Sequence, residues 1–118
     1  MDKLLLLYPN FKDEKIDNLG ISYYCPHCAM MEGIIQYYPQ LRDLLEIIYV
    51  DFKRPRKIII DLIGEENQGC PVLIIEKNAT ENIDTSYFKT YQNLLFVNST
   101  NLIAKYLSEK HKIGLPHP

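Results

Sequence analysis

Apolar runs separated by polar connections divide the chain into strand-like and helix-like segments. Short apolar runs at residues 4–8, 46–52, 70–76 and 93–97 predict four strands. Apolar residues that recur three and four positions apart predict helices over residues 26–38, 55–63 and 100–113. The order β-α-β-α-β-β-α indicates an α/β fold with a four-stranded mixed sheet flanked by helices. The long polar stretch between the last two strands favours their antiparallel pairing.

A few residues mark where these elements begin. Pro26 and Pro55 each fit the first turn of a helix, where the missing N–H costs nothing. Thr100 is the expected N-cap of the last helix. Pro71 is tolerated because it comes at the start of its strand. The polar connection over residues 9–24 is long enough to suggest a function of its own.

Composition indicates one globular domain over residues 1–118. Apolar residues make up 47% and charged residues 24% of the chain, both ordinary for such a domain. The net charge is −2 and no basic stripe is present, so we expect no nucleic-acid partner. The apolar run at residues 4–7 is shorter than a secretory signal of roughly 7–15 apolar residues or a membrane span of about 20. We therefore expect a cytoplasmic protein, without a membrane partner, in a compartment where thiols stay reduced.

The motif CPHC, Cys25 to Cys28, carries the chemistry of the sequence. Cys25 is expected at a helix N-terminus, where unpaired N–H groups and the helix dipole stabilise a thiolate. Cys28, one turn further on, can attack a mixed disulfide at Cys25 and resolve it. His27, when protonated, adds positive charge near Cys25 and makes the disulfide easier to reduce. A redox dithiol is the leading interpretation, with Cys25 as nucleophile and Cys28 as resolving thiol.

This order of elements, with CPHC and a later Cys70–Pro71 before a strand, resembles the thioredoxin fold. The segment STNLIAKYL, residues 99–107, resembles the end of the glutathione-binding domain of glutathione transferases. The whole pattern, including CPHCAMMEG, GEENQG and the ending LPHP, is most similar to a bacterial family of small thioredoxin-fold proteins labelled only as a domain of unknown function.

The resemblance implies a glutaredoxin-like thiol–disulfide oxidoreductase and further site residues. Pro71 matches the proline that is cis in this fold and faces the dithiol, and Cys70 before it faces the dithiol too. We expect a glutathione site built from Pro71, from Val72 with an outward-facing backbone, and from Ser99 and Thr100 at the start of the last helix. The alternative is that Thr100 only caps its helix. No cofactor is expected. Glutathione is the leading co-substrate, a protein thiol is the alternative partner, and the oligomeric state stays open.

Other interpretations remain open at this point. No metal site is expected, because structural zinc needs four ligands and no second paired spacing follows Cys28; an iron–sulfur cluster shared across a dimer is a minority alternative. A thioredoxin-fold binding module without turnover is the other alternative. Cys70 is either a third reactive thiol, which could complete a three-sulfur cluster, or a packed apolar residue. The basic stretch KRPRK, residues 53–57, is interpreted as a solvated helix start, with attraction of a carboxylate as its alternative.

Overall fold

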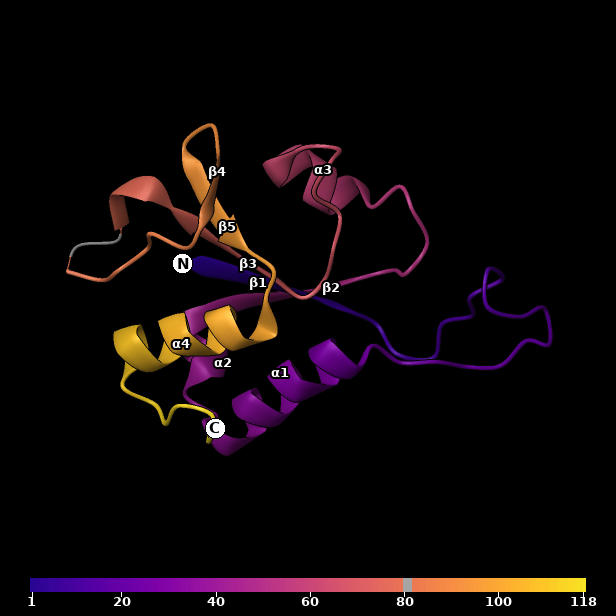
Figure 1. Ribbon diagram of the computed structural model, residues 1–118, viewed down its shortest axis with the longest axis horizontal. Coiled ribbons are helices and arrows are strands. Elements are labelled where there is room, and N and C mark those ends of the chain that lie inside the picture. The colour runs from indigo at the N-terminus through magenta and orange to yellow at the C-terminus, as the bar shows by residue number, and fades with distance from the viewer. Residues whose placement is uncertain (80–81) are drawn as a thin grey trace.

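The computed structural model describes residues 1–79 and 82–118 (Figure 1). Its elements are β1 (Asp2–Leu7), α1 (Pro26–Tyr37), α2 (Leu41–Leu44), β2 (Leu45–Val50), α3 (Lys57–Ile63), β3 (Val72–Glu76), the 3-10 helix η1 (Lys77–Ala79), β4 (Lys89–Tyr91), β5 (Leu94–Val97) and α4 (Thr100–His111). Within this described part, no helix is long and apolar enough to cross a membrane.

The strands form one open mixed sheet in the order β2-β1-β3-β5-β4. β1 pairs in parallel with β2, while the β1–β3, β3–β5 and β5–β4 pairs are antiparallel. The expected antiparallel pairing of the strands at 70–76 and 93–97 is therefore confirmed.

The prediction of four strands is wrong, because β4 adds a fifth at the edge of the sheet. β4 is three residues long and mostly exposed, so it carries no apolar run that a sequence pattern could reveal. It joins β5 through a tight turn in which Gln92 has a φ of 53°.

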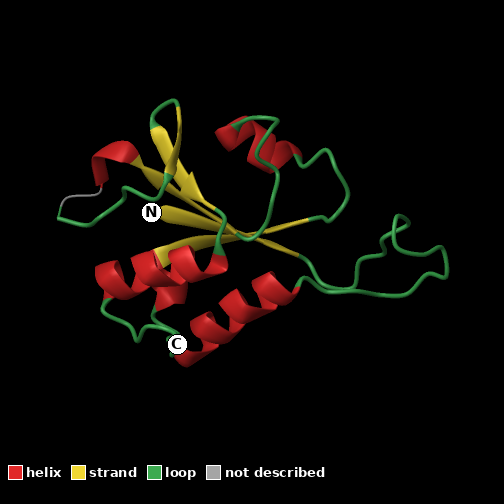
Figure 2. Cartoon of the chain, viewed as in Figure 1, coloured by secondary structure: helices red, strands yellow, loops and turns green. Residues whose placement is uncertain are grey.

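Helices cover both faces of the sheet (Figure 2). α1 and α4 pack against each other on one face, and α3 lies on the other (Figure 1). The leucines of β1, in the middle of the sheet, explain why its sequence is an unbroken apolar run: Leu4, Leu5 and Leu6 have no exposed surface. Met31 of α1 and Tyr106 of α4 are equally buried against this core.

Three predicted element starts move by one or two residues. α3 begins at Lys57 rather than Pro55, and the Arg54–Pro55 peptide bond before it is cis. β3 begins at Val72, after the cis Cys70–Pro71 bond. The N-cap of α4 is Ser99 and not Thr100, because the Ser99 hydroxyl accepts a hydrogen bond from the Leu102 N–H at 3.4 Å.

The connection over residues 9–24 projects from the body of the molecule as a hairpin-like excursion (Figure 1). Its two arms are joined by backbone hydrogen bonds between Phe11 and Tyr23 in both directions, at 3.1 and 2.7 Å. The Phe11 ring stacks on Phe52, after β2, with ring centroids 4.2 Å apart and planes within 2°. This stacking fixes the excursion against the connection that leads into α3.

Candidate functional site

Cys25 is the N-cap residue of α1. Its backbone is extended, Pro26 follows in the first turn, and its sulfur accepts a hydrogen bond from the Cys28 N–H at 3.3 Å. Cys25 is half-buried and lines a cavity at the surface. A sulfur in this position faces the unpaired N–H groups at the start of the helix. The sequence predicted this position from Pro26, and the structure confirms it.

Cys28 differs from Cys25 in its surroundings although only one helical turn separates them. It is 4% exposed, and its sulfur accepts a hydrogen bond from the Leu7 N–H at 3.4 Å. Burial raises the pKa of the Cys28 thiol to about 12; the Leu7 N–H acts in the opposite direction, and neighbouring Cys25 adds to the rise. Cys28 therefore stays protonated at neutral pH as long as Cys25 is a free thiol. All three cysteines of the chain are free thiols.

A cavity of about 430 Å³ opens in front of the two thiols. It is lined by Leu7, Pro9, Tyr24, Cys25, Cys28, Ala29, Glu32 and Tyr49. Within it the Tyr49 hydroxyl donates a hydrogen bond to the Glu32 carboxylate. Burial and this carboxylate both raise the pKa of Tyr49, burial more strongly.

Glu32 and Tyr49 are site residues that the sequence analysis missed. Glu32 lies four residues after Cys28 on α1, which places both on one helical face. That spacing is a signal the sequence does carry. Tyr49 comes from β2, and no local pattern shows that it meets α1.

Cys70 lies near the C-terminal end of β1, on the same side of the molecule as the dithiol. In the β1–β3 ladder Leu5 pairs with Val72, so continuing the register brings Cys70 near Leu7, the residue bonded to the Cys28 sulfur. Burial raises the pKa of the Cys70 thiol to about 11, against the lowering effect of the Arg56 charge. Within residues 1–79 and 82–118, no group of three or more histidine, cysteine or acidic side chains is arranged to hold a metal ion.

The remaining predicted site residues differ in accessibility. Val72 is 1% exposed and Thr100 is 8% exposed, so both side chains belong to the core. Ser99 is exposed at the start of α4. His27 is exposed in the first turn of α1, beside Cys25. Because β5 leads directly into α4, Ser99 lies near the start of β3.

Arg56 corrects the interpretation of residues 53–57 as a solvated helix start. It is only 6% exposed. Its guanidinium donates hydrogen bonds to the Phe52 carbonyl at 3.0 and 2.6 Å and to the Gln68 carbonyl at 2.6 Å. Burial lowers the pKa of Arg56, while the nearby sulfurs of Cys70, Cys28 and Cys25 raise it. The buried Arg56 charge therefore acts most clearly on Cys70, whose pKa it lowers against the effect of burial.

Comparison with curated proteins and with solved structures found no match. Comparison with models of protein families found one whose description is "Protein of unknown function (DUF3088)", and it matches residues 1–115. Because this match covers almost the whole sequence, the chain belongs to the DUF3088 family.

Proposed function

We propose that the chain is a thioredoxin-like thiol–disulfide oxidoreductase in which Cys25 is the nucleophile and Cys28 the resolving thiol. The observation that carries the proposal is the contrast between the two sulfurs. Cys25 is an accessible N-cap that accepts the Cys28 N–H, whereas Cys28 is buried with a pKa raised to about 12. Cys25 is thus placed to attack an outside disulfide, and Cys28 is placed to react in the second step.

The topology supports the same class of protein. The four adjacent strands β2-β1-β3-β5, with β1 parallel to β2 and antiparallel to β3, have the arrangement that the resemblance to thioredoxins implies. β4 is then an addition at one edge. The dithiol lies where the first strand leads into the first helix, and Pro71 lies at the start of the third core strand.

The proposed reaction has two exchange steps. The Cys25 thiolate attacks one sulfur of a substrate disulfide, forming a mixed disulfide and releasing the other sulfur as a thiolate, which takes up a proton. Cys28 then loses its proton and attacks the Cys25 sulfur, which forms the Cys25–Cys28 disulfide and releases the second substrate thiol. The substrate disulfide gains two electrons and the protein dithiol loses two.

Formation of the mixed disulfide favours the second step. Cys25 contributes to the raised pKa of Cys28 through its hydrogen bond and its charge. Once Cys25 is bonded to the substrate, it carries no charge, so that contribution disappears and Cys28 ionises more readily. Burial remains the larger effect, which keeps Cys28 from reacting with outside disulfides.

Turnover needs a reductant, and we propose glutathione, with a protein dithiol as the alternative. Two glutathione thiols would reduce the Cys25–Cys28 disulfide and become one glutathione disulfide. Exposed Ser99 beside Pro71 is the accessible member of the glutathione site proposed from Val72, Ser99 and Thr100. The compartment we propose is the cytoplasm, where such thiols stay reduced.

Trapping the mixed disulfide tests the proposal. With glutathione disulfide as the probe, Cys28→Ser should accumulate one glutathione per chain on Cys25, located by mass spectrometry of peptides. Cys25→Ser should accumulate none, and Cys70→Ser, the matched control, should behave like the wild type. Two results would refute the assignment of Cys25 as nucleophile. One is trapping mainly on Cys70 in Cys28→Ser, and the other is trapping on Cys28 or Cys70 in Cys25→Ser.

A further inference from the structure

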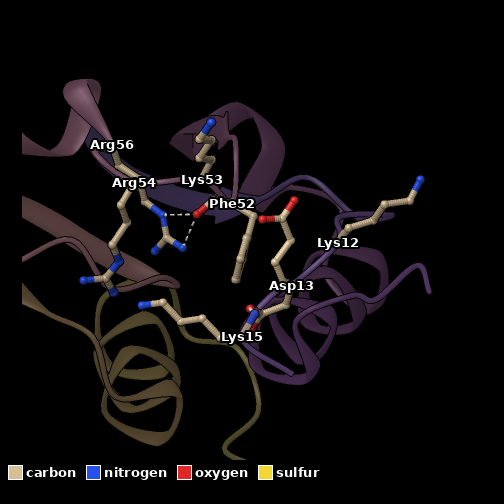
Figure 3. A pocket seen from close by; sticks show the side chains of 8 residues that line it. Lys12, Asp13, Lys15, Phe52, Lys53, Arg54 and Arg56 are labelled. Atoms are coloured by element: carbon tan, nitrogen blue, oxygen red, sulfur yellow. Dashed lines mark hydrogen bonds between the residues drawn. The ribbon is translucent and has the colours of Figure 1, made fainter. Parts of the chain in front are cut away.

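A second cavity, of about 580 Å³, lies between the excursion over residues 9–24 and the connection into α3 (Figure 3). We call it the cationic cavity. It is lined by Lys12, Asp13, Glu14, Lys15, Phe52, Lys53, Arg54 and Arg56. It shares no lining residue with the cavity at the dithiol.

The charge of this cavity contrasts with the charge of the chain. Five of its lining side chains are basic and two are acidic, an excess of three positive charges in a protein whose net charge is −2. Within the described part of the chain, none of the five basic side chains forms an ion pair. Five basic side chains beside only two acidic ones leave positive charges that repel one another, so an anion would be favoured here.

Three of the basic side chains converge. Figure 3 shows the ends of Lys15, Arg54 and Arg56 on one side of the cavity, whereas Lys12 and Lys53 extend away from it. Lys15 comes from the excursion and the two arginines from the connection before α3. Residues distant in sequence therefore present positive charge to one place.

Arg56 shows that this charge is built into the fold. A guanidinium has five N–H groups, and three of them donate to the Phe52 and Gln68 carbonyls, so two remain for a ligand. The two carbonyls accept hydrogen bonds from Arg56 but do not neutralise its charge. Arg56 is only 6% exposed. A buried charge without a counter-charge is costly, and an oxyanion bound in the cavity would offset that cost.

The two segments are held in place without a ligand. The Phe11–Phe52 stack joins them. The Asp13 carboxylate accepts the Lys15 N–H at 3.0 Å, and the Asp13 carbonyl accepts the Ile16 N–H at 3.1 Å, which fixes the turn that carries Lys15. Asp13 thus supports the turn instead of pairing with a lysine ammonium.

From this geometry we propose that the cationic cavity binds a small multivalent oxyanion, either a phosphoryl compound or a polycarboxylate, through Lys15, Arg54 and Arg56. Guanidinium groups suit both ligands because their paired N–H groups match two oxygens of a phosphate or a carboxylate. The cationic cavity shares no lining residue with the dithiol cavity, so anion binding can be measured without reference to thiol exchange.

Calorimetric titration with inorganic pyrophosphate and with citrate tests the site, at an ionic strength of about 10 mM, where charge interactions reach about 30 Å. We expect saturable binding with a Kd below about 1 mM for at least one of them, and the tighter one identifies the phosphoryl or the carboxylate class. The double variant Lys15→Gln and Arg54→Gln should weaken binding at least tenfold.

The matched control is Lys12→Gln with Lys53→Gln, which removes the same charge from the same two segments but at side chains that point away. It should weaken binding less than about threefold, the effect of long-range charge alone. Far-ultraviolet circular dichroism should show that both variants fold. Equal losses in the two double variants, or no saturable binding of either anion by the wild type, would overturn the proposal.

Discussion

Burial, more than position in the motif, distinguishes the cysteines of this protein at the scale of single residues. Cys28 is almost fully buried, and its pKa is raised to about 12; Cys70 is half-buried, and its pKa is raised to about 11. In both cases loss of solvent is the largest cause. Cys25, at the N-cap, is half-buried, and its sulfur accepts the Cys28 N–H.

The raised pKa of Cys28 predicts a dependence of stability on pH. Above pH ~9 the unfolded chain loses the Cys28 proton, while the folded protein keeps it up to about pH 12. The unfolded state then binds fewer protons, so the free energy of unfolding should fall with pH across this window, by at most about 1.4 kcal/mol per pH unit. Urea unfolding at several pH values under reducing conditions measures it.

The matched variant is Cys28→Ala. It removes the contribution of Cys28 to the pH dependence of the free energy of unfolding and keeps the contribution of the tyrosines. The decline of stability from pH 9 to 11 should be shallower in the variant than in the wild type. Parallel profiles would show that Cys28 ionises equally easily in both states, against the burial described above.

His27 should tune the dithiol without acting in proton transfer. It is exposed beside Cys25, and its positive charge when protonated favours the reduced, thiolate form. His27→Ala should make the Cys25–Cys28 disulfide harder to reduce, by about 30 mV, which for a two-electron couple equals about 1.4 kcal/mol. Equilibration with glutathione buffers measures the potential, with His117→Ala, at the exposed C-terminal end, as control. If His27→Ala leaves the potential unchanged, the histidine has no electrostatic role.

Two glycines test how the elements fit together, and they predict opposite signs. Gly33 lies within α1 with no atom near its missing side chain, so Gly33→Ala should stabilise the protein by about 0.5–1 kcal/mol. Gly64, the C-cap of α3, has a φ of 90°, and an added Cβ would lie 2.8 Å from the Tyr91 ring of β4. Gly64→Ala should therefore destabilise it by more than about 1 kcal/mol.

Chemical unfolding of the two variants measures both changes. A destabilised Gly64→Ala would support the close contact between α3 and the added edge strand. A Gly64→Ala variant as stable as the wild type would contradict this contact, and a destabilised Gly33→Ala would contradict the open space beside α1.

The elements could be predicted from the sequence where burial imposes a pattern. The runs in β1, β3 and β5 are largely buried and apolar, the run in β2 is apolar and partly buried, and the helices α1, α3 and α4 carry an apolar face, so the sequence predicted all seven. β4 and α2 are short, and neither has a pattern of its own. At the site, Pro26 was enough to predict Cys25 as the N-cap, because capping is local.

Arg56, Glu32 and Tyr49 belong to the site through tertiary contacts, which the sequence around them does not specify. Arg56 sits in a stretch of basic residues that looks solvated, yet it alone of residues 53–57 turns inward to the carbonyls of Phe52 and Gln68. Tyr49 of β2 contacts Glu32 of α1 only because β2 pairs with β1 in the folded sheet.

At the scale of the whole molecule, the three cysteines lie at one end of the central strands. The C-terminal end of β1, the N-terminus of α1 and the start of β3 bring Cys25, Cys28 and Cys70 together, and the Arg56 charge lowers the pKa of Cys70. Two cavities flank this region, one containing the dithiol and one with an excess of positive charge. The fold thus places a thiol pair, a buried cation and an anion-favouring surface on one small protein.

The potential of the Cys25–Cys28 couple tests the central claim most directly. Equilibration in dithiothreitol and glutathione buffers, followed by alkylation and peptide mass spectrometry, should give one two-electron transition between about −270 and −120 mV, the span of known dithiol oxidoreductases. Cys70→Ser should leave this transition unchanged, and Cys28→Ser should abolish it. A midpoint below about −300 mV, typical of inert structural disulfides, or a disulfide that pairs Cys70 instead, would contradict the account.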